Sequence, residues 1–296
     1  MLSDRFEDNS IKTIHAASDA DLFICQTAVD SASRCPTTLM GEDTDLLVLL
    51  CFHAKPNSFD LYFRSEGKQT TKKRRIWNIK WLQQALGPDT CQLLPFVHAI
   101  SGCDTTSRLF GIGKGVPLKK LKSNPDFKQQ AEIFSRESTR DDIMSAGEKA
   151  LSCLYGGSRK EGLDELRYRR FREKIATRTS AVQVHTLPPP AAAAGYHSAR
   201  VYFQVQEWMD KGSNFNPEEW GWLRVRGKLE HMKTDLPPAP DTLMKVMRCN
   251  CKTNCDTRKC TCRKLGLECS IVCGECKGIN CTNSPHVSTE RLDEEL

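Results

Sequence analysis

Short β-prone and apolar segments alternate over the first 125 residues. Thr37–Met40 is β-prone, Gly41–Asp45 is acidic and turn-like, and Leu46–Phe52 is an unbroken apolar run. A strand, an acidic turn and a buried element in this order are typical of an open α/β sheet, where functional groups lie at the carboxyl ends of the strands. We therefore predict an α/β fold for residues 1–125.

A hairpin and several helices are predicted around these segments. Ser18 is followed three residues later by Asp21, the pattern of an N-cap with its capping box, so a helix is expected to begin there. Leu61–Phe63 and Ile76–Ile79 flank a polar segment and predict a β-hairpin. Gly87 and Pro88 end one helix and another follows. The three helices expected in this region are Leu22–Val29, Lys80–Leu86 and Leu93–Ile100.

The apolar spacing becomes helical beyond residue 125. Three segments carry apolar residues three and four positions apart: Phe127–Phe134, Asp141–Leu154 and Leu163–Ile175. Arginines and aromatic residues are interleaved over Leu166–Arg172. Such a helix face can follow a nucleic-acid backbone, but aromatic residues packed inward with arginines outward are the interpretation we favour.

Proline and alanine interrupt this helical pattern. Val182–Gly195 contains three consecutive prolines and four alanines and predicts a linker or crossing loop. Tyr196–Lys211 then predicts an amphipathic helix. The expected organisation is an α/β region, helices, a linker, a helix with a Pro-rich spacer, a cysteine-rich module and an acidic tail. Their boundaries are residues 1–125, 126–180, 181–195, 196–244, 245–284 and 285–296.

Composition narrows the class of protein only slightly. The 296 residues carry a formal net charge of +6, which by itself does not imply a nucleic-acid partner. No apolar run has the length that a membrane helix needs, and the first residues lack a signal-peptide pattern. Fifteen cysteines without that pattern suggest a reducing compartment, the nucleus or alternatively the cytoplasm. The run Lys72–Arg75 fits a nuclear import signal or a solvated hairpin edge.

Nine of the fifteen cysteines fall within 33 residues near the end of the chain. Thiolates this close are disulfide partners or ligands of a soft metal, of which Zn²⁺ is the commonest. The two Cys-x-Cys pairs argue against disulfides within each pair, because neighbours one residue apart rarely reach good S–S geometry. Nine ligands satisfy three tetrahedral zinc ions if three sulfurs bridge and six bind singly. The candidate ligands are Cys249, Cys251, Cys255, Cys260, Cys262, Cys269, Cys273, Cys276 and Cys281.

This cysteine pattern resembles the CXC domain of the tesmin/TSO1 type. The resemblance implies a nine-cysteine, three-zinc cluster and, in many family members, DNA binding. It covers Cys249–Cys281, differs from the family in the length of some gaps, and has Lys259 where many members carry an aromatic residue.

Charge makes DNA contact by this module plausible. Between Lys245 and Cys281 there are eight Lys/Arg and three acids, or +5, and nine thiolates with three Zn²⁺ reduce this to about +2. The residues expected to face phosphate are Arg258, Lys259, Arg263 and Lys264. The alternative is a purely structural zinc knot that binds a protein partner; we favour DNA or chromatin.

Acidic residues in the α/β region form a second candidate site. Two Asp-x-Asp pairs and one later aspartate could converge at strand ends and bind Mg²⁺ or Mn²⁺, which prefer oxygen ligands. Such ions activate water for phosphodiester cleavage. The residues are Asp19, Asp21, Asp43, Asp45 and Asp104. Gly111 and Gly113, just before Lys114 and a lysine-bearing helix, would expose backbone N–H groups to a phosphate.

These acids and glycines resemble the internal part of the flap-endonuclease/XPG-like 5′ nucleases, members of the PIN-like superfamily. The resemblance spans roughly residues 15–122 and implies that the five aspartates are metal ligands and that Gly111 and Gly113 grip DNA backbone. The family also has an earlier strand with a metal-binding Asp, which the 18 residues before Asp19 are too few to supply. We therefore expect a fragment or a relic of a nuclease, derived from a mobile element.

Three hypotheses follow. The first is a zinc-dependent DNA- or chromatin-binding protein with an inactive nuclease-like region. The second is a Mg²⁺-dependent, structure-selective DNA nuclease that is active when the missing N-terminal part is present. The third is a protein-binding zinc scaffold. The six cysteines outside the cluster, and His15 and His98, are expected to pack or cap rather than to bind metal.

Overall fold

The computed structural model describes most of the chain, and the descriptions below are confined to that part. The described residues are 2–16, 20–65, 75–177, 182–212, 215–234, 249–252, 254–264, 267–269, 273–279 and 281–284. They form two compact units. The first unit comprises Met1–Ala146 and His197–Glu230, and the second comprises Gly147–Tyr196 and His231–Leu296.

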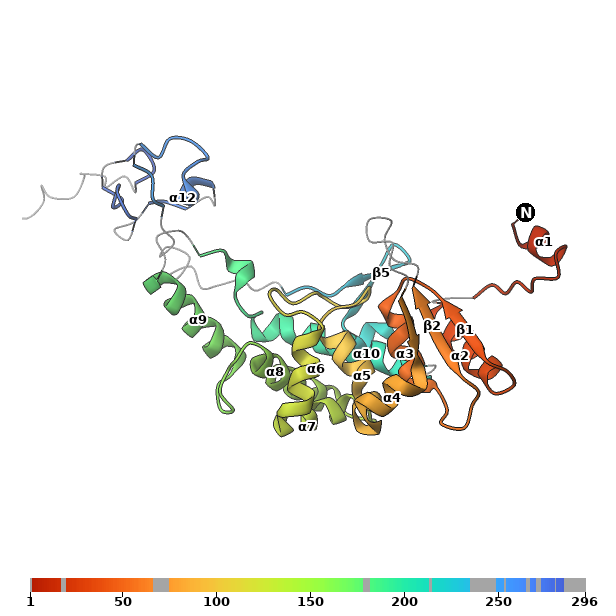
Figure 1. Ribbon diagram of the computed structural model, residues 1–296. Coiled ribbons are helices and arrows are strands. Elements are labelled where there is room, and N and C mark those ends of the chain that lie inside the picture. Colours follow the sequence, from red (N-terminus) through yellow and green to blue (C-terminus); the bar gives the residue numbers. More distant parts are fainter. Residues whose placement is uncertain are drawn as a thin grey trace, which may run out of the picture. The chain divides into compact units, whose positions relative to one another are not determined.

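A three-stranded sheet forms one side of the first unit (Figure 1). Strand β1 (Thr37–Met40) pairs in parallel with β2 (Leu61–Ser65), which pairs antiparallel with β3 (Arg75–Asn78). Leu39 lies opposite Phe63, and both side chains are buried. The predicted strand and hairpin are therefore confirmed, while the predicted polar tip over 66–74 lies outside the described residues.

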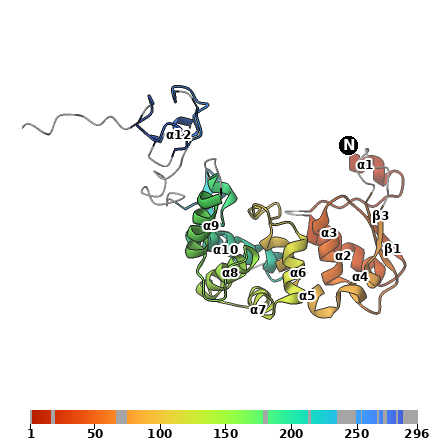
Figure 2. The ribbon, with the colours of Figure 1, turned by 60° about the vertical axis from the view of Figure 1, so that its left-hand side comes forward.

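Helices α2 (Asp21–Ala32) and α4 (Ile79–Leu86) pack against this sheet, and α3 (Thr44–His53) packs against both of them. Helix α2 contacts β1, β2 and α3. Figure 2 shows α2, α3 and α4 beside the strands of the sheet. The apolar run Leu46–Phe52 is thus a helix, with Leu49 and Leu50 fully buried. The helix expected over Leu22–Val29 is confirmed as part of α2. The predicted capping box is wrong, because the N-cap is Ala20 and makes no side-chain capping bond, and Ser18 lies outside the described residues.

A central helix, α5 (Pro88–Ile100), is buried along most of its length. Its Phe96 ring packs against Phe134 at 4.7 Å and against Phe127 at 5.8 Å between ring centroids. Burying three such rings together is a large source of hydrophobic stabilisation. The helices that precede and follow α5 are α4 (Ile79–Leu86), α6 (Gly115–Ser123), α7 (Pro125–Phe134) and α8 (Arg140–Leu154); α1 is Leu2–Glu7.

Helix α10 (Ala191–Trp208) corrects the predicted linker. The four alanines assigned to the linker 181–195 begin this helix, since alanine has the highest helix propensity and the prolines lie before the first turn. The predicted helix over Tyr196–Lys211 is confirmed apart from its end. Its Tyr202 is fully buried against Phe134 and Trp220. The core of the first unit therefore includes residues far beyond the predicted boundary at 125.

A short ribbon follows α10. The 3-10 helix η3 (Pro217–Trp220) leads into β4 (Trp222–Val225), which pairs with β5 (Lys228–His231). Arg226 and Gly227 form the turn between them, both with positive φ (50° and 79°). Two residues in this conformation are the turn that best suits a twisted β-hairpin.

In the second unit, two arginines of α9 (Leu163–Thr177) form ion pairs with glutamates of the same chain. Arg169 pairs with Glu161 at 2.7 Å and with Glu173 at 2.9 Å, and Arg170 pairs with Glu173 at 3.0 Å. Phe171 is buried beside Val182 and Leu187, near the 3-10 helix η1 (Val184–Thr186). The aromatic-inward interpretation of this helix is supported for Phe171, whereas Tyr168 remains 47% exposed.

Candidate metal centre and candidate acidic site

The cysteines of the C-terminal region gather around one point. Seven of them are buried together, and Cys251, Leu267 and Cys281 pack against them while remaining half-buried. The seven are Cys249, Cys255, Cys260, Cys262, Cys269, Cys273 and Cys276. The core of this region therefore consists almost entirely of sulfur.

The distances between sulfur atoms match a metal–sulfur tetrahedron. Sγ of Cys249 lies 3.7 Å from Sγ of Cys255 and 3.8 Å from that of Cys269, and the Cys262–Cys273 pair is 3.7 Å apart. Disulfide sulfurs would be separated by about 2.05 Å. Zn–S bonds of about 2.3 Å at tetrahedral angles place sulfurs about 3.8 Å apart. The spacing is therefore that of ligands around a common ion.

Three groups of four sulfurs have mutual separations short enough to hold a metal ion. The groups are Cys249/Cys262/Cys269/Cys273, Cys249/Cys255/Cys260/Cys269 and Cys255/Cys269/Cys276/Cys281. Cys249 and Cys255 each belong to two groups, and Cys269 belongs to all three. The sulfurs that belong to more than one group are the natural bridging ligands.

The polypeptide around the sulfurs is fixed by hydrogen bonds to the segment that follows Cys281. The backbone N–H of Thr282 donates to Asn254 Oδ1 (2.8 Å), and that of Cys269 donates to the carbonyl of Asn283 (2.6 Å). Asn283 Nδ2 donates to the carbonyl of Leu267 (2.8 Å) and to Cys269 Sγ (3.4 Å). Donors that contact a sulfur ligand stabilise its thiolate and hold its orientation.

Arg263, a predicted DNA contact, joins this frame instead. It lies in the short helix α12 (Thr261–Lys264), next to Cys262. Its Nε donates to the carbonyl of Cys255 (2.6 Å), and one of its terminal nitrogens donates to the carbonyl of Thr282 (2.9 Å). The other three predicted contacts, Arg258, Lys259 and Lys264, have exposed side chains.

Crowding changes the acidity of the thiols. Burial raises the pKa of Cys249, Cys255 and Cys269, and raises that of Cys262 to about 12. Burial opposes ionisation of Cys260 as well, but the backbone N–H of Arg263 and the neighbouring thiols lower its pKa to about 7. So many thiolates cannot share one small volume without a cation between them. A divalent metal would supply that cation.

The acidic site lies in the first unit, and three of its predicted residues come together. Carboxylate oxygens of Asp21, Asp43 and Asp45 all lie within 4.8 Å of one another. Asp21 opens α2, and Asp43 is the N-cap of α3, where its side chain accepts from the backbone N–H of Asp45 (2.9 Å). The predicted convergence of the acidic residues is therefore confirmed for these three carboxylates. Asp19 lies outside the described residues.

A histidine of the chain itself contacts this site. His98 Nε2 lies 2.5 Å from Asp45 Oδ1, with both side chains buried. Burial alone would raise the pKa of Asp45, but the hydrogen bond and charge of His98, together with Lys114 and Asp43, lower it overall. His98 thus packs and pairs with a carboxylate, as expected for a structural histidine.

The side chain of Lys114 is directed toward the acidic site rather than into solvent. Its ammonium donates to the backbone carbonyl of His98 (2.9 Å) and to that of Gly102. Burial lowers its pKa, while the charges of Cys103, Asp45, Asp43 and Asp104 work in the opposite direction. Asp104 is exposed and belongs to none of the ligand groups found among the described residues.

The glycine loop before α6 is open. A Cβ placed on Gly111 or Gly113 would meet no atom within 4 Å, and Gly111 has φ of +73°. A shallow hollow runs along Gly113, Gly115, Lys119 and Lys120. The loop is therefore accessible, as a phosphate contact would require.

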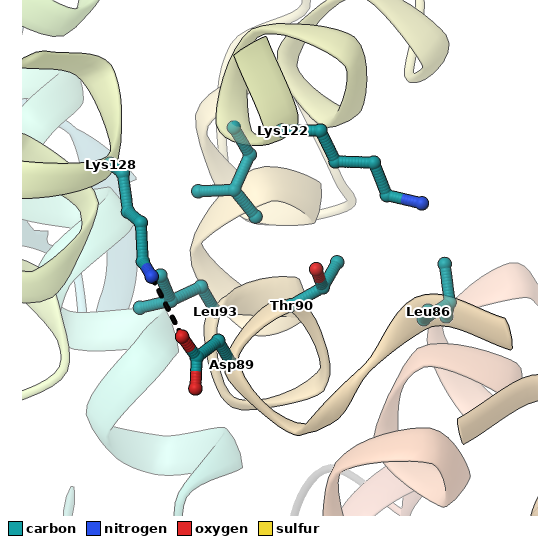
Figure 3. Close-up of a pocket in the computed structure, with 7 residues that line it drawn as sticks. Leu86, Asp89, Thr90, Leu93, Lys122 and Lys128 are labelled. Carbon is teal, nitrogen blue, oxygen red and sulfur yellow. Dashed lines mark hydrogen bonds and ion pairs between the residues drawn. The ribbon is translucent and has the colours of Figure 1, made fainter. Parts of the chain in front are cut away.

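A separate pocket of about 330 Å³ lies where the start of α5 meets the end of α6 and the start of α7 (Figure 3). Asp89 and Lys128 form an ion pair across it at 2.8 Å, and this hydrogen bond lowers the pKa of Asp89. Thr90 and Lys122 complete its polar lining. It contains none of the predicted site residues.

Two of the six cysteines outside the cluster are ordinary buried thiols. Cys25 and Cys51 are buried in the first unit, and burial raises the pKa of each to about 12. Buried neutral thiols of this kind are inert packing groups.

No helix in the described part of the chain has the length and apolar character required to span a membrane.

The sequence did not indicate the polar residues that support the cysteine cluster. Asn254, Asn283 and Thr282 follow no ligand spacing, so nothing in the pattern distinguished them from loop residues. Arg263 was counted only as a positive charge.

Comparison with protein-family models, with curated proteins and with solved structures found no match.

Proposed function

We propose that this chain is a zinc-binding protein whose C-terminal module contacts duplex DNA in the nucleus, and whose nuclease-like region is inactive. The observation that carries the proposal is the set of sulfur–sulfur distances of 3.7–3.8 Å, shared among three overlapping groups of four cysteines. Such a set supports a cluster of zinc ions with bridging thiolates rather than separate sites.

The overlap of the groups leads to a specific ligand assignment. If Cys249, Cys255 and Cys269 each bridge two ions, the first and third groups are complete with four sulfurs. The second group retains Cys249, Cys255 and Cys260 and lacks one ligand. Cys251 packs against the cluster and is the one cysteine of the nine that belongs to no group. We assign it as the fourth ligand of that ion.

Three exposed cations form the proposed DNA contact. Arg258 and Lys259 precede Cys260, and Lys264 ends α12, so all three lie within a few residues of a rigid metal-held frame. Exposed lysines and arginines on a rigid frame can neutralise phosphates without first paying much ordering entropy. Arg263 would act indirectly by holding the frame.

Duplex-DNA binding by the zinc-loaded full chain tests this surface. Replacing Arg258, Lys259 and Lys264 by glutamine should lower the slope of log affinity against log salt by about 2.7, since each phosphate contact contributes about 0.9. Zinc content should remain unchanged. Arg263→Gln serves as the contrasting variant and should lose zinc. An unchanged salt slope in the triple variant would contradict the DNA surface and favour the protein-binding scaffold.

A second candidate function rests on Asp21, Asp43 and Asp45, whose oxygens lie within 4.8 Å of one another. They could bind Mg²⁺ or Mn²⁺ in a structure-selective nuclease once the further acidic ligands of such a site are supplied. Cleavage of a flap DNA with Mg²⁺, abolished by Asp45→Ala and Asp104→Ala, would establish this function. Absence of cleavage by an N-terminally extended protein would eliminate it.

A further inference from the structure

The β4–β5 ribbon is exposed over its whole length beyond the first residue. Eight consecutive residues, Leu223–Glu230, have exposed side chains. A two-stranded ribbon that buries neither face gains little stability from its own pairing. We therefore looked for a role of the exposed ribbon in binding a partner rather than in packing within the chain.

The base of the ribbon is firmly anchored in the first unit. Trp220, just before β4, stacks on Tyr202 at 4.6 Å and on Phe215 at 5.6 Å between ring centroids. Arg200, which is buried, donates to the carbonyl of Gly221 (3.2 Å). These contacts hold the base of the ribbon against the core, while the residues at its tip are exposed.

Positive charge is concentrated at the tip. Arg224 lies two residues before the turn position Arg226, and Lys228 lies two residues after it. The acids lie at the base: Glu218 pairs with Arg224 at 3.1 Å, and Glu230 is the third residue after the turn. Arg226 and Lys228 are thus the charges most available to an external phosphate.

The dimensions of the ribbon suit a DNA groove. Paired strands lie about 4.8 Å apart, and four residues extend about 13 Å. The major groove of B-DNA, about 12 Å wide and 8.5 Å deep, admits a two-stranded β-ribbon. The half-exposed Leu223, Val225 and Leu229 would add apolar contact area within it.

We propose that the β4–β5 ribbon is a second DNA-binding element, which inserts its Arg226–Lys228 tip into the major groove of duplex DNA. The charge complementarity of the tip, its full exposure and its anchored base carry the proposal. It does not depend on the zinc module, because the ribbon up to Glu230 belongs to the first compact unit and is anchored at Trp220 and Gly221.

The test uses the full zinc-loaded chain and a 20-base-pair duplex, with affinity measured by fluorescence anisotropy over a series of salt concentrations. Arg226→Asn with Lys228→Gln removes two charges and keeps the turn, since asparagine tolerates positive φ. The salt slope should fall by about 1.8, and affinity at 0.1 M salt should fall at least tenfold. The matched control is Lys55→Gln with Lys211→Gln, two exposed lysines elsewhere in the first unit, which should leave the slope unchanged.

The outcomes separate this proposal from the function proposed for the zinc module. A ribbon variant that keeps the slope of the control pair overturns the ribbon, even if the Arg258/Lys259/Lys264 variant loses affinity. The reverse result sustains the ribbon and removes the module from the DNA contact. A wild-type chain that binds no duplex at all overturns both. Circular dichroism and zinc content of each variant exclude misfolding as the cause.

Discussion

The cysteine cluster and the acidic cluster are both sets of metal-type ligands, yet their surroundings differ. Around the sulfurs, the neighbouring groups are backbone amides, the side-chain amide of Asn283 and other sulfurs, and burial raises the pKa of Cys249 and Cys255. Around the carboxylates, the neighbouring groups are basic side chains: His98 contacts Asp45, and Lys114 lies close enough to influence it electrostatically. We therefore expect the cysteine region to need a metal in order to fold, and the acidic cluster to be stable without one.

The largest expected effect distinguishes shared sulfurs from single ligands. Cys255→Ser removes a sulfur assigned to two ions and should empty most of the cluster, whereas Cys281→Ser removes a ligand of one ion and should lose at most one zinc. Structural zinc contributes on the order of 10 kcal/mol of binding free energy to such small modules, so the first variant should leave residues 249–284 unfolded. Native mass spectrometry gives the zinc count, and equal losses in both variants would refute the assignment.

The acidic cluster should show a smaller effect that needs no metal. Asp45→Ala leaves His98 buried without its partner and should lower the free energy of unfolding of the first unit by about 3 kcal/mol. Urea denaturation measures this change. Asp30→Asn, at an exposed position of α2, is the control and should change stability little. An Asp45→Ala protein as stable as the control would show that the pair contributes nothing.

The pH dependence of stability follows from the same pair. The pKa of Asp45 is lowered in the folded chain, so its contribution is complete above the ordinary value of 3.8 and is lost as the pH falls through the folded value. The wild-type chain should therefore lose more stability than Asp45→Asn does as the pH falls below about 4. Parallel pH profiles of the two proteins, measured by urea denaturation, would contradict this sign.

The smallest effect concerns the start of α3. Asp43 caps the backbone N–H of Asp45, and Asp43→Ala should cost about 1 kcal/mol of unfolding free energy. Asp43→Asn keeps the capping oxygen and should cost only a few tenths of that. Thermal unfolding of the two variants distinguishes capping from a charge effect, because a charge effect would make them equally unstable.

Secondary-structure elements were predicted correctly where the sequence pattern that specifies them covers only a few neighbouring residues. Thr37–Met40 and the hairpin at Leu61 and Ile76 were predicted correctly because alternation and turn residues act over a few positions. The helix over Ala191–Gly195 was missed, because three prolines outweighed the helix propensity of the alanines that follow them. The exposed β4–β5 ribbon was also missed, since its apolar and basic residues form no buried face.

The candidate sites show the same limit. The nine cysteines were recognisable from spacing alone, and the convergence of Asp21, Asp43 and Asp45 followed from their order along the chain. Neither the inward role of Arg263 nor the contact of Lys114 with the carbonyl of His98 could be predicted, because each depends on where distant backbone returns. Charge counts identify basic residues but not the direction of their side chains.

Zinc-edge X-ray absorption spectroscopy on the purified full chain, combined with metal analysis, tests the central claim most directly. The account predicts three zinc ions per chain, each surrounded by four sulfurs at about 2.3 Å and each with zinc neighbours across shared thiolates. Fewer zinc ions per chain, a shell containing nitrogen or oxygen, or late cysteines joined as disulfides would contradict it.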